Sequence, residues 1–188
     1  DGVSWYQDTP TTSLNIFSSL KLNLNSSIID IGAGKSFLAD NLLNLGYNDI
    51  TILDISGNAL NEVKERVKEK NHTIKCIESN ITDLSSDKKY DVWHDRAVFH
   101  FITNNTERDK YLDILNNCIN KDGYLIIGTF SEDGPLKCSG LEVHRYSVDE
   151  LRELLKDTFQ LINGFKEIHD TPFNTTQSFT FCLFKKTT

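Results

Sequence analysis

Residues 29–36 read Ile-Asp-Ile-Gly-Ala-Gly-Lys-Ser and lie between a short apolar run and an amphipathic segment. The apolar run, residues 27–31, predicts a buried strand, and residues 36–45 predict a helix that ends at Gly46. Two glycines in the connection allow a tight turn and a close approach of the backbone to a ligand. The amides that begin the helix favour a carboxylate or a phosphate. The stretch therefore predicts a strand, a ligand-binding loop and a helix.

Two common nucleotide sites do not fit this glycine loop. A P-loop needs a glycine five positions before Gly34, and the chain has Ile29 there. A dinucleotide site needs a third glycine at position 37, which is Phe37. The pattern therefore disfavours an NTPase and a nicotinamide or flavin enzyme, although Gly34-Lys35-Ser36 by itself is like the end of a P-loop.

Strand-like and helix-like segments alternate along the chain, with no repeat or linker between them. The expected strands are residues 27–31, 50–55, 73–78, 90–95, 124–130, 159–168 and 178–184, and the expected helices are residues 12–22, 36–45, 57–70, 106–119 and 147–157. Ser147, with Glu150 three residues later, forms a capping box that predicts the start of the last helix. Regular alternation predicts a mostly parallel sheet covered by helices on both faces. The last two strands are too close in sequence for a helical crossover, so we expect the last strand to be antiparallel. We therefore expect one α/β domain over residues 1–188.

Acidic residues follow the first three expected strands. Asp54 lies 20 residues after Gly34, a spacing that suits hydrogen bonds to ribose hydroxyls. Its alternative role is a helix cap, although Ser56 can serve as that cap itself. For Asp83, which follows the third strand, the alternative is a surface turn. The carboxyl ends of parallel strands meet at one edge of the sheet. These two acids together with Asp30 are therefore a more specific indication of a ligand-binding site at that edge than any one of them alone.

The acid and glycines of Asp30-Ile31-Gly32-Ala33-Gly34 resemble the first motif of class I S-adenosylmethionine (SAM)-dependent methyltransferases. Asp95-Arg96-Ala97 is similar to the Asp-Arg-Gly of thiopurine- and tellurite-type enzymes and, more distantly, to the Asp-Lys-Gly of elongation-factor lysine methyltransferases. Other segments are similar to one subgroup of small, mostly bacterial or archaeal methyltransferases, so that the resemblance covers essentially the whole chain. They are Ser4-Trp5-Tyr6-Gln7 with Ser13-Leu14, residues 93–101 (Trp-His-Asp-Arg-Ala-Val-Phe-His-Phe), and Cys138-Ser139-Gly140-Leu141 before Arg145-Tyr146.

The resemblance implies a Rossmann-like three-layer α/β/α sandwich with a seven-stranded, mostly parallel sheet, SAM as cofactor and S-adenosylhomocysteine (SAH) as product. In this family Asp30 would orient the amino group of the methionine part of SAM. Asp83 would bind the adenine amino group, and Ile81 would pack near the adenine ring. The expected cofactor-binding residues are Asp30, Gly32, Ala33, Gly34, Asp54, Ile55, Ile81, Asp83 and Asp95.

The fourth expected strand ends in His94, Asp95 and Arg96, which puts three ionisable groups where open α/β sheets bind ligands. These three are the expected catalytic residues. His94 and Asp95 are candidates for a base or an orienting group, and Arg96 could hold an anionic acceptor. The alternatives are a satisfied, partly buried histidine for His94, and for Arg96 an ion pair with Asp91 or another buried acid. His100 is more typical of a core position.

We expect the methyl acceptor to lie between residues 1–25, an N-terminal lid or helix segment, and residues 131–146, an acceptor-side loop. The expected substrate-binding residues are Trp5, Tyr6, Cys138, Arg145, Tyr146 and His169, with ordinary packing or loop chemistry as the alternative for each. The expected acceptor is a small molecule: a thiol, a chalcogen or metalloid compound, or a small acid. A lysine side chain of a protein is one alternative, and a SAM-binding module without catalysis is another.

Composition argues against several other classes. The formal net charge is −7, which disfavours nucleic acid as a partner because nucleic-acid-binding proteins concentrate Lys and Arg. No stretch approaches the roughly 20 apolar residues of a membrane span. The four cysteines match no zinc-binding spacing, so no metal is expected. Reduced, buried thiols are the expected state of the cysteines, which predicts a cytoplasmic protein. No membrane partner is expected, and the oligomeric state is left open.

Overall fold

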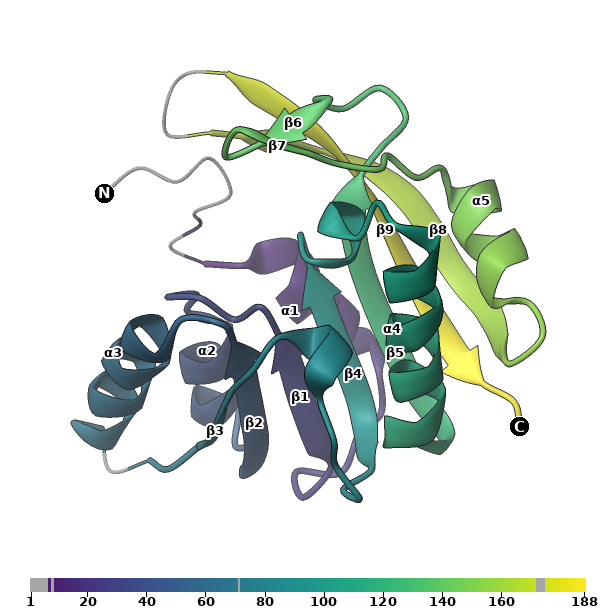
Figure 1. Cartoon of the computed structure of the whole chain (residues 1–188). Helices are drawn as coiled ribbons and strands as arrows, with labels where there is room; N and C mark the ends of the chain where they lie inside the picture. Colours follow the sequence, from purple (N-terminus) through teal and green to yellow (C-terminus); the bar gives the residue numbers. More distant parts are fainter. Residues whose placement is uncertain (1–6, 8, 71, 172–174) are drawn as a thin grey trace.

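The computed structural model describes residues 7, 9–70, 72–171 and 175–188. Its main sheet has seven strands in the order β3-β2-β1-β4-β5-β9-β8 (Figure 1). The strands are β1 (Ser27–Ile31), β2 (Asp49–Asp54), β3 (Lys75–Glu78), β4 (Tyr90–Arg96), β5 (Ile119–Phe130), β8 (Phe159–Asp170) and β9 (Thr176–Lys186). Strands β1 to β5 pair in parallel, and β9 lies antiparallel between β5 and β8. The predicted sheet, with its antiparallel last strand, is confirmed.

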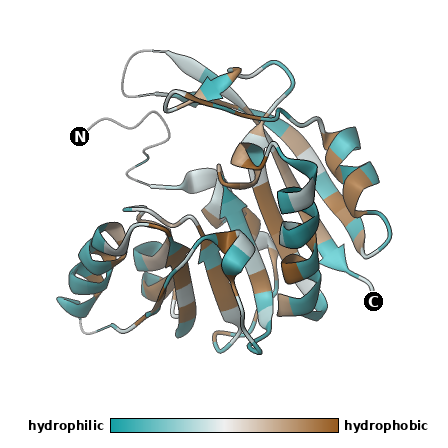
Figure 2. Cartoon of the chain, viewed as in Figure 1, coloured by the Kyte–Doolittle hydropathy of each residue, from teal (hydrophilic) through white to brown (hydrophobic). Residues whose placement is uncertain are grey.

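Helices cover both faces of the sheet (Figure 1). One hydrophobic cluster joins the sheet to α1 (Thr11–Ser19), α2 (Leu38–Asn44) and α3 (Gly57–Lys68). A second cluster, on the other face, joins it to α4 (Asn105–Cys118), α5 (Val148–Leu155) and the short 3-10 helix η1 (Ile81–Asp83). Figure 2 shows apolar residues concentrated on the strands and polar residues on the outer sides of the helices. The expected three-layer sandwich is thus present.

Side-chain caps begin three of the helices. Ser56 accepts a hydrogen bond from the amide of Ala59 at α3, and Asn104 accepts from two amides at α4. At α5, Ser147 accepts from the amide of Glu150, as the sequence predicts. Each of these oxygens satisfies an amide that has no partner within its helix, so the caps fix where the helices start.

Most elements begin and end within about three residues of the expected bounds, and two segments differ more. Strand β5 begins at Ile119 rather than at Tyr124, because Ile119 already pairs with Tyr90 across a register shift in β4. The segment 131–146, expected to be a loop, contains the small hairpin β6 (Lys137–Cys138) and β7 (Leu141–Glu142).

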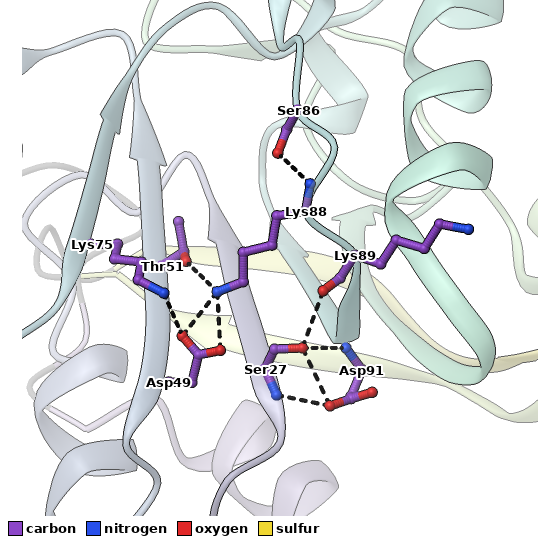
Figure 3. A network of polar contacts seen from close by, with 8 residues as sticks. All are labelled: Ser27, Asp49, Thr51, Lys75, Ser86, Lys88, Lys89 and Asp91. Atoms are coloured by element: carbon purple, nitrogen blue, oxygen red, sulfur yellow. Dashed lines mark hydrogen bonds and ion pairs between the residues drawn. The ribbon is translucent and has the colours of Figure 1, made fainter.

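Polar contacts tie the strands together at the amino edge of the sheet (Figure 3). Asp49, at the start of β2, accepts hydrogen bonds from Lys75 at 3.1 Å and from Lys88 at 2.8 Å. Asp91 of β4 accepts from the backbone amide of Ser27 at 2.8 Å. These contacts link β1, β2, β3 and β4 at the amino edge, whereas the glycine loop lies at the opposite, carboxyl edge.

Candidate active site

The glycine loop between β1 and α2 lies at the carboxyl edge and needs both of its glycines. Gly32 and Gly34 have φ values of +62° and +51°, which glycine adopts without strain. A Cβ atom on Gly32 would lie 2.0 Å from Cγ2 of Val98. The loop therefore packs directly against the turn that follows β4, and larger residues would separate the two.

Asp54, at the end of β2, holds the glycine loop from the side. Its Oδ2 accepts from the amide of Gly34 at 2.8 Å, and its Oδ1 accepts from the amide of Ser56 at 2.8 Å. Ser56, and not Asp54, caps α3. Next to Asp54, the side chain of Ile55 is 75% exposed.

The two residues expected near adenine follow β3. Ile81 and Asp83 are both in η1, where Ile81 is buried in the core and Asp83 is exposed. Their roles toward the cofactor stay predictions.

Asp30, His94 and Ser13 form a buried chain of hydrogen bonds. Oδ1 of Asp30 lies 2.7 Å from Nδ1 of His94, and Nε2 of His94 lies 2.8 Å from Oγ of Ser13. The register between β1 and β4 sets Asp30 beside His94, and α1 brings Ser13 to them. Both ring nitrogens of His94 therefore have hydrogen-bond partners, and the side chain is buried, which is the alternative that the sequence left open. His94 also lies directly beside Asp30, the acid that is expected to bind the cofactor.

Arg96 lies beyond His94 at the end of β4. Its guanidinium carbon is 5.4 Å from the centre of the Phe179 ring. Burial lowers the pKa of the Arg96 guanidinium, and the nearby carboxylates of Glu167 and Asp30 oppose that shift. Asp91, named as one possible partner, lies near the other end of β4 and bonds to Ser27, so the acids that face Arg96 are Glu167 and Asp30.

A small cavity of about 30 Å³ connects these groups, enough for one group the size of a water molecule. Its lining joins the glycine loop to α1 and β4 and consists of Pro10, Ser13, Asp30, Gly32, Ala33, Ser36, Leu38, His94 and Arg96. Of the expected site residues, Asp30, Gly32, Ala33, His94 and Arg96 therefore meet at one place.

Asp95 points to the other face of the sheet. Its side chain is fully buried, with Oδ1 accepting from the amides of Val98 at 3.0 Å and Phe99 at 3.2 Å, and Oδ2 accepting from the Tyr111 hydroxyl at 2.6 Å. Burial raises the pKa of Asp95 to about 6, while these hydrogen bonds oppose the shift. Asp95 is thus placed to hold the turn after β4, and its carboxylate does not reach the cavity that His94 and Arg96 line.

The four expected acceptor residues that the structure describes do not gather at one point. Cys138 is buried in the cluster under α1 to α3, whereas Tyr146 is buried in the cluster under α4 and α5, with its ring 5.1 Å from that of Phe99. Arg145 donates to the backbone carbonyl of Gly134. His169 is buried, and its Nδ1 lies 3.2 Å from Nε2 of Gln7. Trp5 and Tyr6 lie outside the described residues.

Sequence reasoning missed Ser13 as a site residue. The signal was present, because Ser13 shares the buried face of α1 with Ile16 and Phe17, three and four residues later. A serine on the apolar face of a helix needs a partner, and here the partner is His94. Thr12, which donates to Glu167, was missed as well.

Among the described residues, no helix is both long and apolar enough to cross a membrane. In the same part of the chain, no group of three or more His, Cys, Asp or Glu side chains could hold a metal ion. All four cysteines are free thiols.

The strand order, the single antiparallel strand and the glycine loop at the carboxyl edge define a Rossmann-like fold of the methyltransferase class. The chain belongs to the methyltransferase domain family, whose model matches residues 22–181. This confirms the class of enzyme that the sequence predicts.

A curated relative is the ribosomal protein L11 methyltransferase of Staphylococcus haemolyticus, 33% identical over 129 residues. That match covers 67% of this chain and 39% of the relative. The chain spans about two fifths of the length of the curated relatives it matches.

Solved structures share the fold at low sequence identity. TehB from Haemophilus influenzae superposes with a TM-score of 0.78 at 17% identity, covering 96% of this chain and 63% of TehB. A 1,6-didemethyltoxoflavin N1-methyltransferase from Burkholderia thailandensis, solved with SAH and its substrate, has a TM-score of 0.75 at 18% identity, covering 95% of this chain and 78% of that one. SAM as cofactor agrees with the family and with these neighbours.

Proposed function

We propose that this chain transfers the methyl group of SAM to a small nucleophilic acceptor. The observation that carries the proposal is the arrangement of Asp30 and Asp54 on either side of the glycine loop, with Asp30 lining a cavity that continues to His94 and Arg96. When bound, SAM supplies a methyl group on a positively charged sulfur. The protein's task is to bind the cofactor, to position the acceptor and to exclude water.

The residues present fit such a cofactor. Asp54 is half-buried, and two backbone amides fix its carboxyl group, whose remaining lone pairs can accept hydrogen bonds from ribose hydroxyls. The exposed Ile55 offers an apolar surface to an adenine ring. Asp30 offers a carboxylate to the amino group of the methionine part, and we assign Asp83 to the adenine amino group.

A small acceptor is favoured by the way the N-terminal segment approaches β8. Thr12 donates to Glu167 at 2.5 Å, and Gln7 contacts His169. These contacts join α1 and Gln7, which precedes it, to β8, and β8 carries Glu167, one of the acids near Arg96. A thiol, a chalcogen or metalloid oxyanion, or a small carboxylic acid fits a site next to a buried guanidinium.

A protein acceptor is the second candidate, because the curated relatives methylate ribosomal protein L11 by name. A SAM-binding module without catalysis is the third. The four free cysteines support the cytoplasm as the compartment, since thiols stay reduced there.

Calorimetric titration with SAM and SAH, with NAD and ATP as controls, tests the cofactor. We expect micromolar binding of SAM and SAH alone. Asp54→Ala is expected to weaken SAH binding by about tenfold or more, because it removes charge-assisted hydrogen bonds worth roughly 1.5–3 kcal/mol. Asp87→Ala, which changes an exposed aspartate in a loop, is the matched control and should bind as the wild type does. Equal affinity of the Asp54 variant and the wild type would contradict the ribose assignment.

An acceptor screen then separates the candidates. Thiols, selenium and tellurium oxyanions and small carboxylic acids are incubated with labelled SAM, in parallel with purified ribosomal protein L11. Label in a small product supports the proposal. Label only in L11 supports the second candidate, and binding without any transfer supports the third.

A further inference from the structure

Ser13, His94 and Asp30 come from three different elements and are all buried, at 1%, 3% and 3% exposure. The two contacts that join them, 2.8 Å and 2.7 Å, both have hydrogen-bond length. All three residues also line the small cavity beside the glycine loop. The chain of contacts is thus part of the wall of the site.

The direction of these hydrogen bonds follows from what each group can donate. An ionised carboxylate can only accept, so Nδ1 of His94 must carry the hydrogen that faces Asp30. Neutral imidazole has one N–H, so Nε2 then has a lone pair and accepts the hydroxyl hydrogen of Ser13. A doubly protonated His94 would instead donate to both partners and turn the Ser13 hydrogen toward the cavity.

With neutral His94, both Ser13 and Asp30 offer only lone pairs to the cavity. Oδ2 of Asp30 accepts no hydrogen bond from the described residues. Two acceptors that face a space of about 30 Å³ suit one compact, positively charged donor, and an ammonium group is about the size of water. The guanidinium of Arg96 lines the same cavity and suits an adjacent carboxylate.

We propose that Ser13 binds the ammonium group of an α-amino acid moiety, and that His94 is a positioning residue that turns the Ser13 hydroxyl and the Asp30 carboxylate toward it. The inference rests on the proposed function, because SAM carries such a moiety. It assigns to α1 a direct part in selecting ligands that end in an amino acid.

Binding of two ligands that differ only in this moiety tests the proposal. SAH has the amino acid group, and 5′-methylthioadenosine has the adenosine and the thioether without it. Ser13→Ala is expected to weaken SAH binding by about tenfold, as for a hydrogen bond to a charged group, and to change 5′-methylthioadenosine binding by less than about twofold. Asp54→Ala should weaken both ligands. Ser18→Ala, an exposed serine of the same helix, should weaken neither.

The position of the hydrogen on the His94 ring is tested in the wild type without any ligand. Long-range proton–nitrogen spectra of 15N-histidine-labelled protein report which ring nitrogen carries hydrogen, and His94→Gln identifies the signal among the five histidines. We expect the Nδ1–H form. The Nε2–H form, or an equal loss of both ligands in Ser13→Ala, would overturn the inference. If neither ligand binds the wild type, the proposed function itself is overturned, a result distinct from either of these.

Discussion

Asp30 and Asp95 end neighbouring strands, yet they face opposite sides of the sheet. Asp30 pairs across the strands with His94, and Ile31 pairs with Asp95. On the face of α1, α2 and α3, Asp30 bonds to His94 and lines a cavity. On the face of α4 and α5, Asp95 accepts three hydrogen bonds and is fully buried.

The difference lies in how many donors each carboxylate meets. Asp95 is saturated, by two amides of its own turn and by Tyr111, which in turn accepts a hydrogen bond from Trp93. That turn carries Val98, which touches the glycine loop. A buried carboxylate whose two oxygens both accept hydrogen bonds is typical of a structural role. A carboxylate beside a cavity with fewer hydrogen bonds can accept one from a ligand.

The largest expected effect that separates the two acids is on stability. Asp95→Ala leaves two buried donors and one partly buried donor without partners and is expected to lower the free energy of unfolding by roughly 3–5 kcal/mol. Asp30→Asn keeps an acceptor for His94 and should cost about 1 kcal/mol or less, while it weakens SAH binding. Urea unfolding of both variants measures this, and similar losses of stability would remove the distinction.

The next effect is the pH dependence of stability that Asp95 contributes. Its pKa is raised from 3.8 to about 6 by burial, so the folded state binds the proton more tightly than the unfolded state. The stability that Asp95 contributes is therefore fully present below pH 3.8 and is lost as the pH rises to about 6. The shift corresponds to about 3 kcal/mol.

This contribution is measured by urea unfolding of the wild type and of Asp95→Asn between pH 4 and 7. The difference between their free energies of unfolding should change with pH by that amount. A constant difference across that range would show that Asp95 does not titrate there.

The smallest expected effect concerns the hydroxyl of Tyr111. Tyr111→Phe removes one charge-assisted hydrogen bond to Asp95 and one acceptor for Trp93, and should lower the free energy of unfolding by about 2 kcal/mol. SAH binding should change by less than about twofold, because Tyr111 is on the face away from the cavity. Tyr124→Phe, at a half-buried tyrosine of β5, serves as the control.

Periodicity and turn residues were enough to predict most of the fold. Apolar runs predicted the seven strands, and Ser147 with Glu150 predicted the start of α5. The early start of β5 was not predictable, because Ile119 belongs to the strand only through its pairing with Tyr90. Local preference has no information about a partner strand.

The candidate site was predicted in part. Asp30, Gly32 and Ala33 stand where the glycine motif puts them, and His94 and Arg96 join them in one cavity lining. Cys138 and Tyr146, expected to share the acceptor side, are buried in separate clusters on the two faces. Their sequence neighbourhood did not reveal which face each side chain would enter.

The sequence by itself determined the class of the protein. The glycine loop after the first strand and the acids near the ends of the first three strands are local patterns that can be recognised along the chain. Only the tertiary structure decided the roles of His94 and Asp95. Adjacent residues of a strand point to opposite faces, and what each face supplies comes from distant parts of the chain. Ser13 of α1 meets His94, and Tyr111 of α4 meets Asp95, so one residue is at the site and the next supports it.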